Sequence, residues 1–398
     1  MQRSLCILAL IVLALPAWPA KKISVAELTT MLKSMQDQKR SDTEVASALR
    51  QVQLSEELTR STMNGLANYA PGPLTTEQIY VLEARSATLA PPATDIPSAP
   101  AADATTQRAI LDKAAEYATK TYARLPELTA TKTTLRFQDN VEAAAPSSGL
   151  RGGATDVSVG STFVSPFQFV HYINSTDSVY SSERGIEKLR DDKTKWGANK
   201  MIALQAPDPS LGNVFQEAQL VGAISWLRWE NINGKPAAVF SFQVPKKKSH
   251  LNVNICCFPD IDQAGVARFS SAAVAGLQGG SGGSRGNFQT TTDWRNFKSD
   301  GVPYHGEFFI DPDSGIVVRM ITQAEFKPTE VVHQLDTRVD YAPVKVGSNI
   351  MILPIKTVID NEVVPNGDSE AAGKFSTRCT LFTIEYKDYQ LADATAHK

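Results

Sequence analysis

The sequence predicts an α+β protein in which a small N-terminal helical bundle precedes a curved antiparallel β-meander packed on a long helix. Two observations lead to this prediction. Apolar residues recur at helical spacing behind capping signals in residues 24–90. Beyond residue 130, alternating runs are separated by hairpin signals such as Asn233-Gly234 and Asp311–Gly315. Strands joined by short turns form antiparallel meanders, and too few helices lie between them for a doubly wound sheet.

Length and charge exclude some classes of protein. The chain has 398 residues, enough for two or three folding units with a buried core. Its 40 basic and 42 acidic residues leave a formal net charge of -2. The run Lys246–Lys248 is typical of a solvated strand end, and nothing in the composition indicates a nucleic-acid partner.

Residues 1–20 have the pattern of a signal peptide. Arg3 precedes an apolar run from Leu5 to Leu15, which is too short to span a bilayer. Small residues follow, and we expect cleavage near Ala17–Ala20. Cys6 lies too early for a lipobox, and no later segment is long and apolar enough for a membrane helix. We therefore expect a periplasmic or secreted protein that is not a lipoprotein and has no transmembrane segment in the mature chain.

Residues 24–90 are predicted to form a helical domain of four short amphipathic helices. Ser24 with Glu27, and Ser41 with Glu44, are capping boxes that begin the first two helices. A third helix is expected to begin at Ser55, and a fourth at Thr75–Gln78.

A Pro/Ala-rich linker, residues 91–105, leads to a helix-plus-β domain, residues 106–391. The first helix of that domain is expected over 106–125, because its apolar residues recur every three or four positions until Pro126. A further helix is predicted near 213–222 and a flexible Gly-rich loop over Ala272–Gly286. The first predicted strand is 131–137, and the others are 155–164, 166–173, 198–205, 224–232, 236–244, 249–257, 303–311, 316–326, 330–342, 349–360 and 374–389.

The sequence contains no convincing catalytic or metal-binding pattern. Ser281 and Ser284 match G-x-S-x-G, but their flanks lack the strand and helix of a nucleophile elbow. Asp311 and Asp313 resemble the start of a calcium loop without its closing glutamate, so they predict a β-turn. The five histidines are scattered without ligand spacing (His171, His250, His305, His333 and His397). We therefore predict no catalytic residue, no metal site and no cofactor.

Two features leave alternatives open. Cys257 and Cys379 are positioned for a disulfide in an exported protein, or they are buried small apolar residues. The aromatic residues of the central strands form ordinary core or line an apolar cavity on a curved sheet. The candidate ligand-lining residues are Phe167, Phe169, Tyr172, Trp226, Trp229, Phe240 and Phe242.

The chain resembles an uncharacterised family of exported acidobacterial proteins. The matching pieces include the junction LPELTATKTT (125–134), Ile224–Trp229 and Gly306–Arg319. At the level of shape, a long helix ahead of a meander is similar to the lipoprotein carriers of the LolA/LolB type. That resemblance implies a half-barrel, a strongly curved sheet that encloses an apolar cavity for acyl chains.

The leading functional hypothesis is a non-enzymatic protein whose β domain binds a hydrophobic ligand, such as a lipid, or an acylated partner. The alternative is a cell-envelope interaction scaffold that docks an envelope protein through its N-terminal helical domain. The third hypothesis is an unrecognised hydrolase.

Overall fold

The computed structural model describes residues 21–139, 170–188, 203–204, 210–256, 296–328, 330, 332–363 and 378–392. The predicted signal peptide, Phe167, Phe169, Cys257, His397 and the Gly-rich segment with Ser281 and Ser284 lie outside these residues, as does the predicted strand 155–164. No helix within the described ranges is long and apolar enough to cross a membrane.

Residues 21–90, here called the helical unit, form a small bundle with its own core. A short parallel pair of strands joins its first and middle parts. The core contains Leu28, Leu32, Leu49 and Leu58, each at most 1% exposed. The elements are β1 (Lys21–Ile23), α1 (Val25–Asp37), α2 (Asp42–Leu49), β2 (Val52–Leu54), α3 (Arg60–Leu66), the 3-10 turn η1 (Ala67–Tyr69) and α4 (Pro73–Arg85).

Local side-chain caps set the starts of α1, α2 and α3, but not of α4. Both predicted capping boxes are confirmed at the N-termini of α1 and α2. The predicted starts of the third and fourth helices are wrong. The third helix is capped by Thr59 and not by Ser55.

The fourth helix begins at Pro73, before the predicted start at Thr75. Its first amides are capped from another helix: the Asp42 carboxylate of α2 accepts from Leu74 N (3.0 Å) and Thr75 N (2.8 Å). A cap supplied by a distant residue leaves no local sequence signal.

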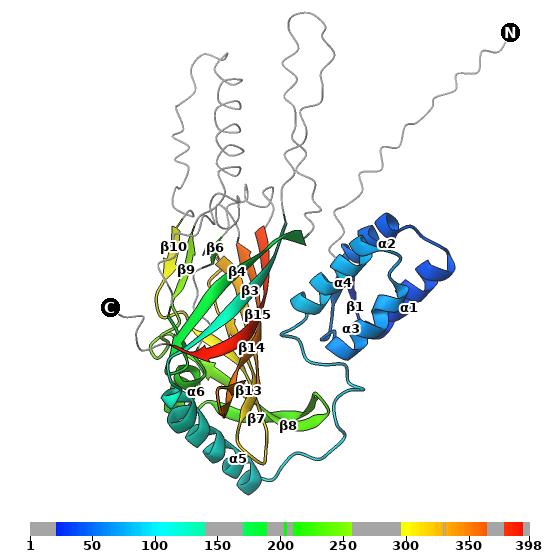
Figure 1. Cartoon of the computed structure of the whole chain (residues 1–398). Helices are drawn as coiled ribbons and strands as arrows, with labels where there is room; N and C mark the ends of the chain where they lie inside the picture. The colour runs from blue at the N-terminus through cyan, green and yellow to red at the C-terminus, as the bar shows by residue number, and fades with distance from the viewer. Residues whose placement is uncertain are drawn as a thin grey trace, which may run out of the picture.

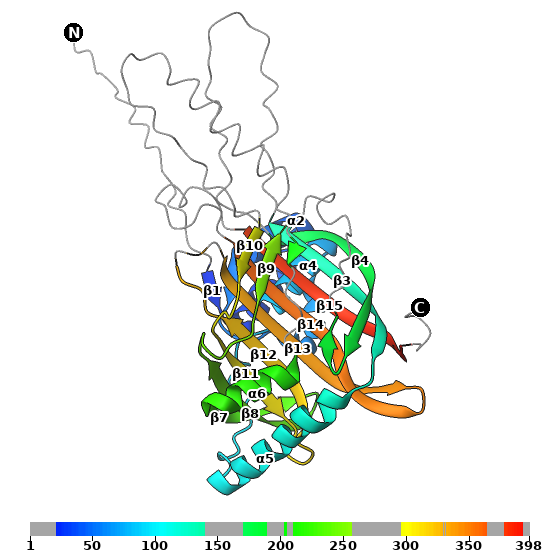
Figure 2. The ribbon, with the colours of Figure 1, turned by 90° about the vertical axis from the view of Figure 1, so that its left-hand side faces the viewer.

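The rest of the described chain is dominated by one antiparallel sheet, in the order β5-β4-β3-β15-β14-β13-β12-β11-β8-β7. The sheet is curved and open, and the predicted α+β class is confirmed (Figure 1 and Figure 2). Its strands are β3 (Leu128–Asp139), β4 (Val170–Glu183), β5 (Ile186–Glu187), β7 (Ile224–Ile232), β8 (Lys235–Val244), β11 (Tyr304–Ile310), β12 (Val317–Ala324), β13 (Val332–Val346), β14 (Asn349–Val363) and β15 (Arg378–Leu391). A smaller sheet contains β6 (Ala203–Leu204), β9 (Val253–Cys256) and β10 (Asn296–Ser299).

Both predicted hairpin turns are present. Asn233 and Gly234 have positive φ angles of 51° and 80° between β7 and β8, as a type I′ turn requires. In the turn between β11 and β12, Gly315 N donates to Asp311 O, and the Asp311 carboxylate accepts from Asp313 N and Ser314 N. The aspartates of this segment therefore shape a turn.

The sheet has two different faces. On β13, Val339 and Tyr341 point to a face that belongs to the largest apolar cluster, whereas Arg338 and Asp340 point to the opposite face. We call these the apolar face and the charged face. Strand alternation makes the division, because successive side chains of a strand leave on opposite sides.

Helices cover the apolar face at one side of the sheet (Figure 1). Ala114 and Ala118 are fully buried against the sheet, and the Phe215 ring lies 4.9 Å from the Phe308 ring. Small residues let the helix approach closely, while Phe215 fills the remaining space. The covering elements are α5 (Ala104–Glu116), its π-helical and 3-10 continuations η2 (Tyr117–Thr121) and η3 (Tyr122–Arg124), and α6 (Leu211–Val221), close to the two predicted helices.

Candidate functional site: a charged cleft between the helical unit and the sheet

The helical unit packs on the charged face of the sheet. Val81 and Ala84 of α4 share an apolar cluster with Val358 of β14 and Leu381 of β15. Polar contacts surround this cluster. Lys356 Nζ lies 2.8 Å from Glu83 Oε1, and Arg85 Nε lies 3.6 Å from Asp360 Oδ2. The helical unit and the sheet therefore form one packed structure.

Glu57 is the most deeply inserted charge of the helical unit. It follows β2, and its backbone amide is fixed by a hydrogen bond to Ala90 O. The side chain is 7% exposed. One carboxylate oxygen accepts from Arg338 Nη1 at 2.5 Å, and the other lies 3.7 Å from Arg319 Nη1. Glu57 thus lies between two arginines that belong to different strands.

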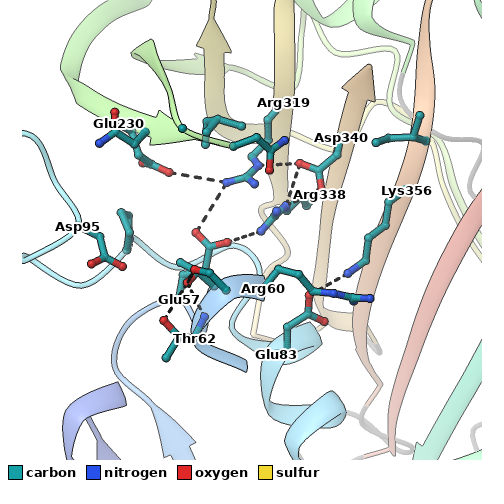
Figure 3. Close-up of a pocket in the computed structure, with 18 of the residues that line it drawn as sticks. Glu57, Arg60, Thr62, Glu83, Asp95, Glu230, Arg319, Arg338, Asp340 and Lys356 are labelled. Atoms are coloured by element: carbon teal, nitrogen blue, oxygen red, sulfur yellow. Dashed lines mark hydrogen bonds and ion pairs between the residues drawn. The ribbon is translucent and has the colours of Figure 1, made fainter. Parts of the chain in front are cut away.

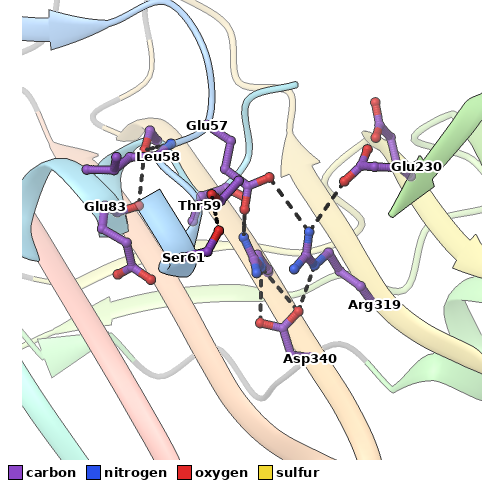
Figure 4. A network of polar contacts seen from close by, with 12 residues as sticks. Glu57, Leu58, Thr59, Ser61, Glu83, Glu230, Arg319 and Asp340 are labelled. Carbon is purple, nitrogen blue, oxygen red and sulfur yellow. Dashed lines mark hydrogen bonds and ion pairs between the residues drawn. The ribbon is translucent and has the colours of Figure 1, made fainter. Parts of the chain in front are cut away.

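These arginines continue into a network across β12, β13 and β7 (Figure 4). Asp340 accepts from both of them, at 2.7 Å from Arg319 Nε and 3.1 Å from Arg338 Nε. Arg319 also lies 3.7 Å from Glu230 on β7. Arg228 pairs in turn with Glu230 at 2.7 Å and with Glu307 of β11 at 2.9 Å.

In this network, burial and ion pairing shift the pKa values of the charged groups in opposite directions. Burial alone would raise the pKa of Asp340, but the guanidinium groups of Arg338 and Arg319 outweigh it and hold that pKa well below its usual range. Burial would also lower the pKa of Arg338, yet Asp340 and Glu57 raise it. At Glu230 burial prevails over Arg228 and Arg319, so the pKa of that carboxyl is raised.

A cleft of ≈ 910 Å³ opens beside this network, with walls from both the helical unit and the sheet (Figure 3). The ionisable lining residues are Glu57, Arg60, Glu83, Asp95, Glu230, Arg319, Arg338, Asp340, Lys356 and Glu385. The neutral lining includes the hydroxyls of Thr59, Ser61 and Thr62, the turn at Asn233-Gly234, and two apolar side chains, Ile232 and Ile355.

Two exposed charges lie at this cleft without an ion pair among the described residues. Arg60 begins α3, and Asp95 follows the helical unit, where its carboxylate accepts only from Thr94 Oγ1 at 3.3 Å. Their charges are available to a ligand. Most of the other ionisable groups that line the cleft are neutralised by each other.

The hydroxyl groups of the lining contact one another. No histidine or cysteine lines the cleft within the described residues, so a hydroxyl such as Ser61 Oγ has no adjacent imidazole base there. Ser61 Oγ instead lies 3.2 Å from Thr59 Oγ1. Elsewhere in the described chain, no group of three or more His, Cys, Asp or Glu residues is arranged to hold a metal ion.

The structure brings together four of the aromatic residues that the sequence suggested as ligand-lining. Phe240 and Phe242 are 0% and 3% exposed on the apolar face. The Trp226 ring lies 5.3 Å from that of Phe240 and 4.9 Å from that of Trp229. Phe240 and Phe242 are buried with Phe308 and Phe215 in the core beneath α5 and α6, and the partly buried Trp226 and Trp229 pack against that core.

Tyr172 does not join that group. It is 43% exposed, and its ring lies 5.7 Å from Phe137, which belongs to the cluster on the charged face. Cys379 is buried in the same cluster, where its Sγ donates to Asp360 Oδ1 at 3.4 Å. Because Cys257 lies outside the described residues, the disulfide stays a prediction.

Two of the scattered histidines contact carboxylates. His250 Nδ1 lies 2.8 Å from Glu217 on α6, and His305 Nδ1 lies 3.0 Å from Glu325. Glu217 also accepts from the Tyr304 hydroxyl at 2.7 Å. Through Glu217, these contacts link α6 to His250 and to Tyr304 of β11, and the His305 contact links β11 to the residue that follows β12. Both histidines are hydrogen-bonded, as predicted for isolated histidines.

Comparison with known proteins adds little. No protein-family model matches the chain, and no curated protein matches it. Among solved structures, a chain of the Pseudomonas aeruginosa MucA/MucB complex matches with 9% sequence identity over 71% of this chain and 94% of that chain. Its TM-score is 0.18, which carries no argument about fold or function.

Sequence reasoning missed the charged cleft. The available signal was the alternation on β13, where Asp336, Arg338 and Asp340 take turns with Thr337, Val339 and Tyr341. Such alternation is usual on a strand with one solvated face. Glu57, the partner of Arg338, lies 281 residues away in the sequence, and no spacing rule connects the two residues.

Proposed function

We propose that this chain is an exported, non-enzymatic binding protein that holds a polar, charged segment of a partner protein in the cleft between the helical unit and the sheet. The observation that carries the proposal is the cleft itself, which has a volume of ≈ 910 Å³ and walls from both parts of the molecule. Export is inferred from the pattern of residues 1–20. The proposal extends the scaffold hypothesis: the partner would bind between the helical unit and the sheet, and not to the helical unit alone.

The chemistry of the lining supports a peptide ligand. Arg60 and Asp95 offer one charge of each sign, so a segment with both acidic and basic side chains would be complementary. The hydroxyls of Thr59, Ser61 and Thr62 are suited to backbone amides and carbonyls. Ile232 and Ile355 provide small apolar contacts. Mixed polar and apolar contacts of this kind are typical of transient protein interfaces.

Selection from a phage-displayed library of random peptides tests this proposal. The full mature chain is immobilised, and the selected peptides are synthesised and titrated calorimetrically. Ser61→Trp places an indole in the cleft, whereas Ser348→Trp adds the same group at the exposed turn between β13 and β14 as a matched control. We expect the peptides to bind wild type and Ser348→Trp alike, and Ser61→Trp at least about tenfold more weakly. Equal binding to both variants, or no enriched peptide, would overturn the proposal.

A second candidate function is the binding of an apolar ligand or an acylated partner on the apolar face. The observation that favours it is the aromatic group of Trp226, Trp229, Phe240 and Phe242, which α5 and α6 cover through one amphipathic face each. A ligand there requires these helices to move. Native mass spectrometry after gentle purification tests it: we expect a retained lipid or uptake of a fluorescent fatty acid, and the absence of both would contradict it.

A further inference from the structure

Two aspartates face each other beneath the helical unit on the charged face. Asp336 of β13 and Asp360 of β14 are direct cross-strand partners. Gln334 Nε2 lies 2.9 Å from Asp336 Oδ2 and 3.5 Å from Asp360 Oδ2, so a single amide reaches both carboxylates. Their exposed fractions are 9% and 6%. Two buried carboxylates opposite each other destabilise the state in which both are ionised.

The helical unit covers this pair. Thr88, just beyond α4, donates from Oγ1 to Asp336 Oδ2 at 3.5 Å. Arg85 at the end of α4 is the ion-pair partner of Asp360. Arg85 is the cation that the helical unit supplies to Asp360, and separation of the helical unit would return both carboxylates to water.

Sheet residues complete the surroundings of the pair. Gln323 of β12 donates to Asp336 at 3.2 Å, and the Cys379 thiol of β15 donates to Asp360. His305 of β11, itself paired with Glu325, lowers the pKa of Asp336 through its charge. These groups belong to the sheet and remain in place when the helical unit leaves.

We infer that ionisation of the Asp336–Asp360 pair weakens docking of the helical unit on the sheet, so that the charged cleft opens as the pH rises. The part of this inference that concerns partner binding rests on the proposed function. The part that concerns docking does not.

The direction follows from the protonation states. Burial, reinforced by the charge of Asp360, raises the pKa of Asp336 to about 6, and burial also raises the pKa of Asp360 against the opposing effect of Arg85. The docked state therefore binds more protons than the undocked state. Docking is strongest below the ordinary aspartate pKa of about 4 and weakens as the pH rises through about 6. The pKa of Asp340 lies well below this window, so its ion pairs with Arg338 and Arg319 are unchanged by it.

The labelling rate of a buried cysteine measures opening directly. Val358 is 3% exposed in the cluster between α4 and the sheet, so a Val358→Cys thiol reacts only when the helical unit leaves. Val317→Cys is the matched control, because Val317 is fully buried on the apolar face. Peptide-resolved mass spectrometry follows labelling of the full mature chain with a maleimide, and each rate is divided by that of a free cysteine peptide at the same pH.

The corrected Val358→Cys rate is expected to rise about tenfold between pH 5 and pH 8, while the Val317→Cys rate stays flat. Adding Asp336→Asn should abolish the rise, whereas Asp37→Asn, an exposed acid on α1, should leave it unchanged. A flat Val358→Cys profile, or a rise that survives Asp336→Asn, would overturn the inference.

A second variant covers the case in which Asp336→Asn fails to fold. Arg85→Gln removes the cation that the helical unit pairs with Asp360, so the corrected rate at pH 8 should exceed that of the parent several-fold. An unchanged rate at pH 8 would overturn the inference. Because no peptide is present in these measurements, their failure is distinguishable from failure of the proposed function.

Discussion

The Glu57 carboxylate of the helical unit lies 2.5 Å from the Arg338 guanidinium of β13, and the two side chains are only 7% and 12% exposed. This contact joins residues 281 positions apart and fixes the wall of the charged cleft. Burying a charge is costly unless a partner of opposite sign is present. The contact therefore makes the helical unit and the charged face of the sheet mutually dependent.

Removal of the Glu57 charge is expected to destabilise the protein strongly. Glu57→Gln leaves Arg338 and Arg319 with Asp340 and Glu230 as their ion-pair partners among the described residues, and breaking a buried pair costs about 3–5 kcal/mol. Urea unfolding checks this. Glu116→Gln removes an exposed charge from α5 and should change the free energy of unfolding by less than about 0.5 kcal/mol. Equal stability of the two variants would contradict the role of Glu57.

The turn between β11 and β12 supports α5, and a pair of glycine substitutions tests this. Gly315 has φ = +74°, and an added Cβ would lie 2.5 Å from Lys113 Cβ of α5. Gly234 has φ = +80° with nothing within 4 Å. Gly234→Ala is expected to cost about 1–2 kcal/mol through backbone strain alone. Gly315→Ala should cost about 1–3 kcal/mol more, because it also displaces the helix.

Both glycine variants are measured by urea unfolding. The same contact between α5 and the turn includes Lys113 Nζ, which donates to Asp313 O at 3.0 Å. Equal losses in Gly234→Ala and Gly315→Ala would show that α5 does not rest on this turn.

A glycine in the middle of the sheet marks a close approach between strands. An added Cβ at Gly306 would lie 1.9 Å from Ile321 O and 2.8 Å from Phe242 Cζ. Gly306→Ala is therefore expected to cost about 3 kcal/mol or more, as overpacking forces the strands apart. Gly65→Ala in α3 meets nothing within 4 Å and should stabilise the protein by about 0.5–1 kcal/mol. A tolerated Gly306→Ala, seen as an unchanged unfolding midpoint, would contradict the packing.

The Asp42 cap on α4 has a pH-dependent contribution. Hydrogen bonds from Thr75 and Leu74 lower the pKa of Asp42 against the opposing effect of burial. Its stabilising contribution is therefore present above the ordinary aspartate pKa of about 4 and is lost as the pH falls through the folded-state pKa. Asp42→Ala should cost about 1–2 kcal/mol at pH 7 and much less at pH 3, measured by urea unfolding at each pH. An equal loss at both pH values would argue against an ionised cap.

Much of the fold was predictable because its signals are local. Ser24 and Ser41 each form a capping box with the glutamate three residues later. The turns at Asn233 and Asp311 are likewise specified by residues within a few positions. The start of α4 was mispredicted because Asp42, from another helix, caps it, and the start of α3 because Thr59, not Ser55, is its N-cap.

The candidate site was not predictable in the same way. Glu57, Arg319 and Arg338 come from three distant segments, and each alone resembles an ordinary surface charge. Only their contact with each other, at low side-chain exposure, identifies them. Conversely, Phe240 and Phe242 were singled out by composition, and their place in the core depends on Phe215 of α6.

The measurement that tests the account most directly is a double-mutant cycle on Glu57 and Arg338. The free energies of unfolding are measured for wild type, Glu57→Gln, Arg338→Gln and the double variant. If the helical unit is held on the charged face through this contact, the two substitutions are coupled by about 1.5–3 kcal/mol. A coupling energy within about 0.3 kcal/mol of zero would contradict the account, because it would mean that the two side chains do not interact in the folded protein.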